Sequence, residues 1–142
     1  MEGGRLPEKN PHNHYKETQI MTASQDKLIV FLYEGAIRFI NNAVTAVEEK
    51  KLDLCNNSLI RAQDIITELA LSINFEAGEI ASKMYNLYMY FNKQLLEANI
   101  NKDTEMMVQI RDMMADILES WRQIADKSVA SSQPGGSLNV SG

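Results

Sequence analysis

Residues that could catalyse a reaction or hold a metal are scarce in this sequence. Both histidines, His12 and His14, lie in an N-terminal stretch rich in glycine, proline and polar residues. A di-iron site in a helical bundle needs a Glu-x-x-His pair on a helix, and a phosphorelay bundle needs a histidine on a helix. Two histidines on a stretch with little to bury make a weak metal site. We therefore expect no metal centre.

Other catalytic motifs are missing from the sequence as well. It contains no nucleophile elbow, no glycine-rich phosphate loop and no Cys-x-x-Cys pair. Several carboxylates fall on the polar sides of expected helices: Glu34, Glu48, Asp64, Glu68, Glu97 and Asp112. These carboxylates have the pattern of solvated surface groups, so we expect no enzyme activity and no cofactor.

Charge and composition exclude further classes of protein. The chain has 142 residues and a net charge of −5, with acidic and basic residues interspersed, which argues against nucleic-acid binding. The single cysteine, Cys55, falls in an apolar helical pattern, which favours a buried reduced thiol. No apolar run approaches the length of about 18 residues that a membrane helix needs, and the N-terminus lacks a signal peptide. We expect a soluble cytoplasmic protein without membrane insertion.

The distribution of proline and glycine divides the chain into three parts. Residues 1–14 and 128–142 are polar and contain every proline and most of the glycines, so both are expected to be disordered. Residues 15–127 contain no proline and only two glycines, Gly35 and Gly78. So long an interval without breakers favours helices over strands. The sequence therefore predicts an all-α domain.

The first expected helix is unusually apolar. Ser24 is a suitable N-cap, Asp26 places negative charge in the first turn, and the helix is expected to end near Lys50. From Leu28 to Val47 its apolar residues cover an arc of roughly 200°, where a surface helix needs about 100° or a little more. This helix must therefore be covered by more than one neighbour.

Three further helices are expected after the first. One runs from Asp53, a plausible N-cap, to about Ile73 with a buried stripe formed by Cys55, Leu59, Ala62, Ile66, Leu69 and Ile73. The residues 74–78 form a break, the third helix runs to about Ile100, and the fourth runs from the N-cap Asp103 to about Lys127. Short connections make consecutive helices neighbours. The sequence thus predicts an antiparallel up-down-up-down four-helix bundle.

Some apolar side chains do not fit the main stripes of their helices. Ile60 and Leu71 fall opposite the buried stripe of the second helix, and Tyr90 points away from that of the third. These apolar residues beyond the main stripes have two explanations. They belong either to an irregular internal core or to a surface that a partner covers. The segment 15–21 holds Tyr15, Ile20 and Met21 among polar residues, and it is either a removable cover for an apolar groove or a simple hydrophobic tether.

The order and spacing of several motifs resemble those of the flagellin-specific export chaperones, the FliS-like family, over about residues 15–125. The matching residues are Tyr15-Lys16, Ile20, Thr22-Ala23-Ser24, Lys27-Leu28-Ile29, Leu32 to Arg38, Ala62 to Ile66, Glu68-Leu69, Gly78 to Ala81, Leu87-Tyr88, Ala98-Asn99, Asp103 and Trp121. Three positions depart from the family pattern, since Gln25 replaces a usual proline, Phe31 a common methionine, and Ala77 a second glycine. The loss of proline should affect stability slightly.

The resemblance implies a cytoplasmic chaperone that binds the C-terminal segment of flagellin before export. It implies flagellin and the flagellar export apparatus as partners, and it leaves a co-chaperone or flagellin regulator open. The hypothesis places the flagellin-binding groove at Ile60, Leu71, Leu87, Tyr90, Tyr33 and Ile37, with Tyr15, Ile20 and Met21 as the cover. The alternative is a structural or regulatory helical bundle that oligomerises through the same apolar surplus.

Overall fold

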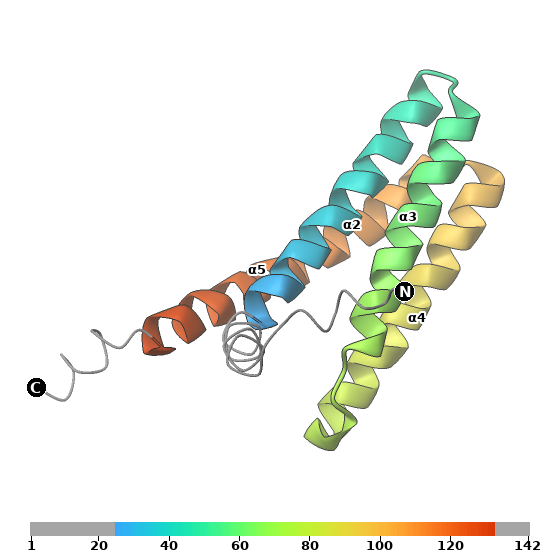
Figure 1. The fold of residues 1–142 in the computed structure, drawn as a ribbon. Helices are drawn as coiled ribbons and strands as arrows, with labels where there is room; N and C mark the ends of the chain where they lie inside the picture. Colours follow the sequence, from blue (N-terminus) through green and yellow to red (C-terminus); the bar gives the residue numbers. More distant parts are fainter. Residues whose placement is uncertain (1–24, 133–142) are drawn as a thin grey trace, which may run out of the picture.

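The computed structural model describes residues 25–132, which form four long helices and one short 3-10 helix. The elements are α2 (Gln25–Glu48), α3 (Leu52–Leu71), η2 (Phe75–Ala77), α4 (Glu79–Asn101) and α5 (Thr104–Ser132). Helices α2 and α4 each contact both α3 and α5, so the four helices form a closed ring of antiparallel neighbours (Figure 1). The predicted all-α antiparallel four-helix bundle is confirmed.

Several features predicted near the two ends of the chain lie outside the described residues, and one helix end differs from its prediction. The cover residues Tyr15, Ile20 and Met21 and the predicted N-cap Ser24 lie outside the described part of the chain, as does most of the predicted C-terminal tail. Helix α5 continues to Ser132, beyond the expected end near Lys127. The sequence offers no breaker before Pro134, so nothing in it forces the helix to stop earlier.

The helix ends confirm one predicted cap and correct another. The Asp103 carboxylate accepts a hydrogen bond from the Met106 N–H at 3.2 Å, as expected of an N-cap. Asp53 is not an N-cap, because α3 begins at Leu52 and has no side-chain cap. The reason lies in the end of α2, where Lys50 takes a left-handed conformation (φ 62) and the Lys51 N–H donates to the Ala46 carbonyl at 2.7 Å. This compact closure leaves Asp53 inside the first turn of α3, where its charge still favours the helix.

The break between α3 and α4 lies where the sequence places it. The Asn74 side chain accepts a hydrogen bond from the Glu76 N–H at 2.9 Å and so caps η2. Gly78 then adopts a φ of 87°, which side-chain-bearing residues rarely take. Helix α3 ends at Leu71, slightly before the expected Ile73.

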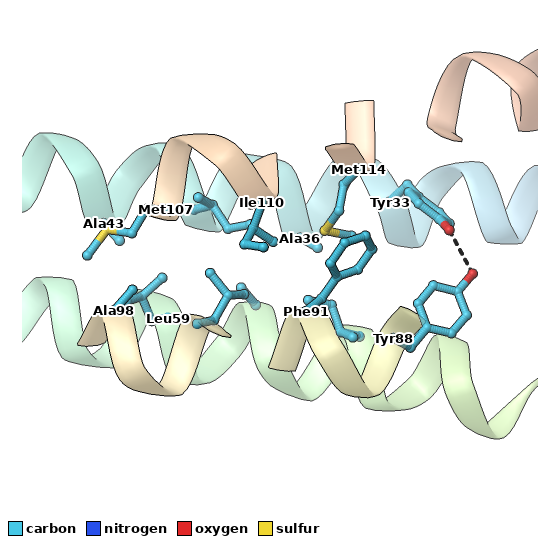
Figure 2. Close-up of a cluster of buried hydrophobic side chains, with 14 of the residues drawn as sticks. Tyr33, Ala36, Ala43, Leu59, Tyr88, Phe91, Ala98, Met107, Ile110 and Met114 are labelled. Atoms are coloured by element: carbon cyan, nitrogen blue, oxygen red, sulfur yellow. Dashed lines mark hydrogen bonds between the residues drawn. The ribbon is translucent and has the colours of Figure 1, made fainter. Parts of the chain in front are cut away.

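The buried core is narrow at one end of the bundle and wide at the other. Around the α2–α3 and α4–α5 connections it contains small residues, among them Ala43, Ala46 and Ala98. Toward the other end it contains Tyr33, Tyr88 and Phe91, as Figure 2 shows. Helices separate further when larger side chains lie between them. The α2–α5 pair and the α3–α4 pair accordingly diverge toward the end where α2 begins, which we call the open end (Figure 1).

The predicted stripe of α3 is confirmed for five of its six residues, whereas the sixth, Ile73, lies beyond the end of α3 and is only partly buried. Cys55, Leu59, Ala62, Ile66 and Leu69 are all fully or almost fully buried. Cys55 is a free thiol, and burial raises its pKa. This thiol is therefore a core residue with little tendency to ionise.

Candidate functional site

An apolar cleft of about 470 Å³ lies at the open end of the bundle. All four helices line it, together with residues of the α3–α4 connection. Its apolar lining consists of Ile29, Leu69, Ile73, Ala77, Ile80, Ala81, Met84, Tyr88, Ile117, Trp121 and Ile124. The polar lining residues are Ser72, Asn74 and Ser120, none of which is charged. We call this site the open-end cleft.

Two hydrogen-bonded tyrosines lie at the inner end of the open-end cleft, one in its lining and one behind it. Tyr88 lines the cleft, and its hydroxyl lies 2.7 Å from the hydroxyl of the fully buried Tyr33 (Figure 2). The two rings are tilted, with centroids 6.2 Å apart. Helices α2 and α4 are diagonal partners in the ring of helices, so this hydrogen bond joins two helices whose backbones do not touch. It stabilises the open end where the bundle is widest.

Burial changes the acid–base behaviour of this pair. Burial raises the pKa of the Tyr33 hydroxyl far above its usual value, and the neighbouring Tyr88 raises it further. Burial also raises the pKa of Tyr88, against a smaller opposite effect of its hydrogen bond with Tyr33. Both hydroxyls therefore stay protonated in the folded protein at pH values where an exposed tyrosine ionises.

Because burial raises the pKa of both tyrosines, we expect the folded protein to lose stability at alkaline pH. Above about pH 10 the unfolded chain releases the tyrosine protons while the folded protein retains them, so the free energy of unfolding falls as the pH rises. The limiting slope is about 1.4 kcal/mol per pH unit for each tyrosine. Urea unfolding of the unmodified protein and of the Tyr33→Phe, Tyr88→Phe double variant, measured between pH 8 and pH 11, checks this. Equal slopes in the two proteins would contradict the assignment.

The rim of the open-end cleft is exposed and apolar. Ile80 on α4 is 67% exposed and Ile124 on α5 is 46% exposed, on two helices that flank the cleft. Met84 and Trp121 lie further in and are partly buried against the core. An apolar cleft with such a rim binds apolar side chains of a ligand or a helix. Among the residues that the structure describes, the lining contains no histidine, cysteine, lysine or carboxylate that could activate a hydroxyl for catalysis.

A second apolar surface runs along the outer side of α3 and α4. The Asn92 side-chain amide donates to the Thr67 hydroxyl at 3.1 Å, which fixes the faces on which these two helices meet. Ile60 and Leu71 share the face of Thr67, and Tyr85 and Leu96 share the face of Asn92, each at helical spacings of seven and four residues. All four are at least 36% exposed. We call Ile60, Leu71, Tyr85, Leu96 and Phe75, whose ring lies 5.6 Å from that of Tyr85, the outer stripe.

The structure separates the residues that the sequence grouped into one groove. Ile60 and Leu71 lie together on the outer stripe. Tyr90 is 43% exposed, but it is two residues from Asn92 and therefore faces away from α3. Leu87 and Ile37 are partly buried against the core.

Tyr33 has no exposed surface, so it supports the open-end cleft from behind and does not face a partner in this structure. The rim residues Ile80 and Ile124, by contrast, were not singled out from the sequence. The available signal was the broad apolar arc of the third helix, which includes Ile80, Met84 and Tyr88. The width of this arc shows that the helix needs contacts on more than one side. It does not show at which end of the bundle the helices separate.

No group of three or more metal-ligating side chains occurs among the described residues. None of the described helices combines the length and the apolar character required to cross a bilayer.

Comparison with known proteins gives the relationships of the chain. The family described as "Flagellar protein FliS" matches residues 8–128. The flagellar secretion chaperone FliS of Bacillus subtilis is 33% identical over 115 residues, covering 81% of this chain and 86% of the relative. The flagellar secretion chaperone FliS of Salmonella typhimurium is 31% identical, covering 79% of this chain and 84% of the relative. That of Campylobacter jejuni is 28% identical, covering 80% and 89%.

The family match covers α2, α3 and α4 completely and α5 as far as residue 128, and so includes every residue of the open-end cleft and the outer stripe. The relatives are named flagellar secretion chaperones, and this name agrees with a cleft whose lining is mostly apolar and carries no charge. The chain belongs to the FliS family of flagellar proteins, a family of chaperones and not of enzymes.

Proposed function

We propose that this protein is a flagellar export chaperone that binds the C-terminal segment of newly made flagellin in the bacterial cytosol. It keeps the segment from polymerising and delivers flagellin to the flagellar export apparatus. The observation that carries the proposal is the open-end cleft, which has an almost wholly apolar lining and an exposed apolar rim at Ile80 and Ile124. We call the flagellin segment the client.

The geometry suits a client that folds as it binds. An amphipathic helix presents apolar anchors every three or four residues, and a groove between helices accepts them. Fully covering one large apolar side chain contributes about 1.5–3 kcal/mol. Ordering a disordered segment costs about 2–5 kcal/mol or more, so several anchors are needed. The open-end cleft and the outer stripe together provide enough apolar side chains for tight but reversible binding.

The N-terminal segment is proposed as a cover for the open-end cleft. Helix α2 begins at Gln25, and Ile29, one turn later, lines the cleft. The segment with Tyr15, Ile20 and Met21 therefore joins the bundle close to the cleft. A cover of this kind would shield the cleft until a client displaces it.

Deletion of residues 1–21 is expected to speed client association, because the client would no longer compete with the segment. Stopped-flow binding of a flagellin C-terminal peptide, compared between the full chain and the deletion variant, measures the association rate. Identical rates and affinities in the two proteins would leave the segment as a tether only.

Calorimetry and light scattering with the flagellin C-terminal segment test the proposed function. We expect a one-to-one complex, weakened when Ile60 and Leu71 on the outer stripe are both replaced by aspartate. Their side chains are exposed, so the variant should stay folded. A stable homodimer that survives an excess of flagellin would favour the alternative of an oligomerising structural or regulatory bundle. Unchanged affinity of the aspartate variant would remove the outer stripe from the binding surface.

A further inference from the structure

Two arginines on neighbouring helices contact the same aromatic ring on the outer face of α2 and α3. The guanidinium of Arg38 lies 5.9 Å from the centre of the Phe39 ring, and that of Arg61 on α3 lies 5.7 Å from it. Both arginines are exposed, while Phe39 is partly buried against the core. Contacts of this length between a cation and a ring are attractive and hold the side chain in place. We call Arg38, Phe39 and Arg61 the arginine seam.

Gly35, one helical turn before Arg38 on α2, leaves room for the Arg38 side chain. A side-chain carbon at Gly35 would lie 3.3 Å from Cδ1 of Ile65 on α3 and 3.8 Å from an Nη atom of Arg38. The Arg38 guanidinium therefore lies near Gly35, where α2 packs against Ile65 of α3. Its planar group is already positioned before any partner arrives.

The other two arginines of the described residues are engaged in ion pairs, whereas the seam arginines are not. Arg122 binds the Glu34 carboxylate at 2.9 Å, and Arg111 binds the Asp112 carboxylate at 3.0 Å. Glu34 lies four residues before Arg38 and would be its natural partner on the helix, but it pairs with Arg122 on α5. Among residues 25–132, neither Arg38 nor Arg61 has a carboxylate within ion-pair distance.

We infer that the arginine seam is a docking site for an acidic stretch of the client, separate from the apolar contacts of the open-end cleft and the outer stripe. The inference rests on the proposed function. A guanidinium binds a carboxylate through two parallel hydrogen bonds, and two guanidiniums held on one ring present a fixed pair of such donors. The chain as a whole carries a net charge of −5, so it repels acidic segments elsewhere and favours them at the seam. The seam would thereby set the direction in which the client lies along the bundle.

The test compares two charge-matched double variants of the full chain. Arg38→Gln with Arg61→Gln removes the seam charges, and Lys83→Gln with Lys93→Gln removes two exposed charges from α4. Calorimetry measures the affinity of each protein for a flagellin C-terminal segment at low and high salt. We expect the seam variant to bind about tenfold more weakly at low salt and with a flatter salt dependence. The α4 variant should bind like the unmodified protein.

A second measurement uses a client segment in which every aspartate is replaced by asparagine and every glutamate by glutamine. It should bind the unmodified protein and the seam variant equally, because no carboxylate remains for the arginines to bind. Equal affinities of the seam and α4 variants for the unmodified segment would overturn the inference. The inference would also be overturned if the seam variant lost self-association but kept its client affinity. That result would assign the seam to contacts with a second copy of the chain. Absence of any binding by the unmodified protein would overturn the proposed function, and the inference with it.

Discussion

Replacing Phe91 by alanine is expected to lower the free energy of unfolding by about 3–5 kcal/mol. Phe91 is fully buried on α4, and its ring lies 6.5 Å from that of Tyr88 and beside Met114 and Ala36 in the wide part of the core (Figure 2). Removal of the ring loses its burial and leaves a cavity that surrounding helices fill only in part. Total stabilities of small domains are about 5–15 kcal/mol, so the loss would be severe.

Tyr90 provides a matched control for this substitution. It is the next residue toward the start of α4 and is 43% exposed, so Tyr90→Ala removes a similar ring from the surface. We expect a loss of about 1 kcal/mol or less. Urea unfolding followed by circular dichroism measures both variants. Equal losses in the two variants would contradict the placement of Phe91 at the centre of the core.

Replacing Ile80 and Ile124 together by aspartate is expected to weaken client binding at least about 100-fold. Each isoleucine contributes about 1.5–3 kcal/mol when a client covers it, and an aspartate buried without a partner adds a desolvation cost. Every 1.4 kcal/mol corresponds to a factor of about ten in affinity. Both side chains are exposed in the free protein, so the fold should be retained. Calorimetry with the flagellin C-terminal segment measures the effect.

The control for the rim lies at the opposite end of the bundle. Leu52 and Ile100 are 50% and 73% exposed, near the narrow end of the core, and lie outside the open-end cleft. Leu52→Asp with Ile100→Asp makes the same change in charge and in exposed apolar surface. Client affinity should change little in this variant. Equal weakening by both double variants would indicate a general effect of added negative charge.

The local features of the fold were predictable because short-range sequence patterns determine them. The stripe of α3 has helical spacing, Asp103 has the side chain of an N-cap, and Asn74 and Gly78 have the chemistry of a break. The misplaced cap at Asp53 shows the limit of this reasoning. The left-handed closure at Lys50 involves a lysine, and no residue type in the connection signals it.

The candidate site was less predictable because it depends on all four helices at once. The open end is wide because Tyr33 of α2 meets Tyr88 and Phe91 of α4 there, and the pattern of one helix alone cannot reveal that meeting. The same patterns grouped Tyr33 with Ile60 as contact residues, although one is in the core and the other on the outer stripe. Exposed residues of a single helix, such as Ile60 and Leu71, were correctly recognised as lying off the main stripe.

Fluorescence of Trp121 tests the central claim most directly. It is the single tryptophan of the chain, and it lines the open-end cleft in a partly buried position. In the variant that lacks residues 1–21, where the proposed cover cannot already shield the cleft, titration with a tryptophan-free flagellin C-terminal segment should shift the Trp121 emission to shorter wavelength and saturate at one equivalent, because the client excludes water from the cleft. Client binding detected by calorimetry with no change in Trp121 emission would contradict the account, since the client would then lie elsewhere on the bundle.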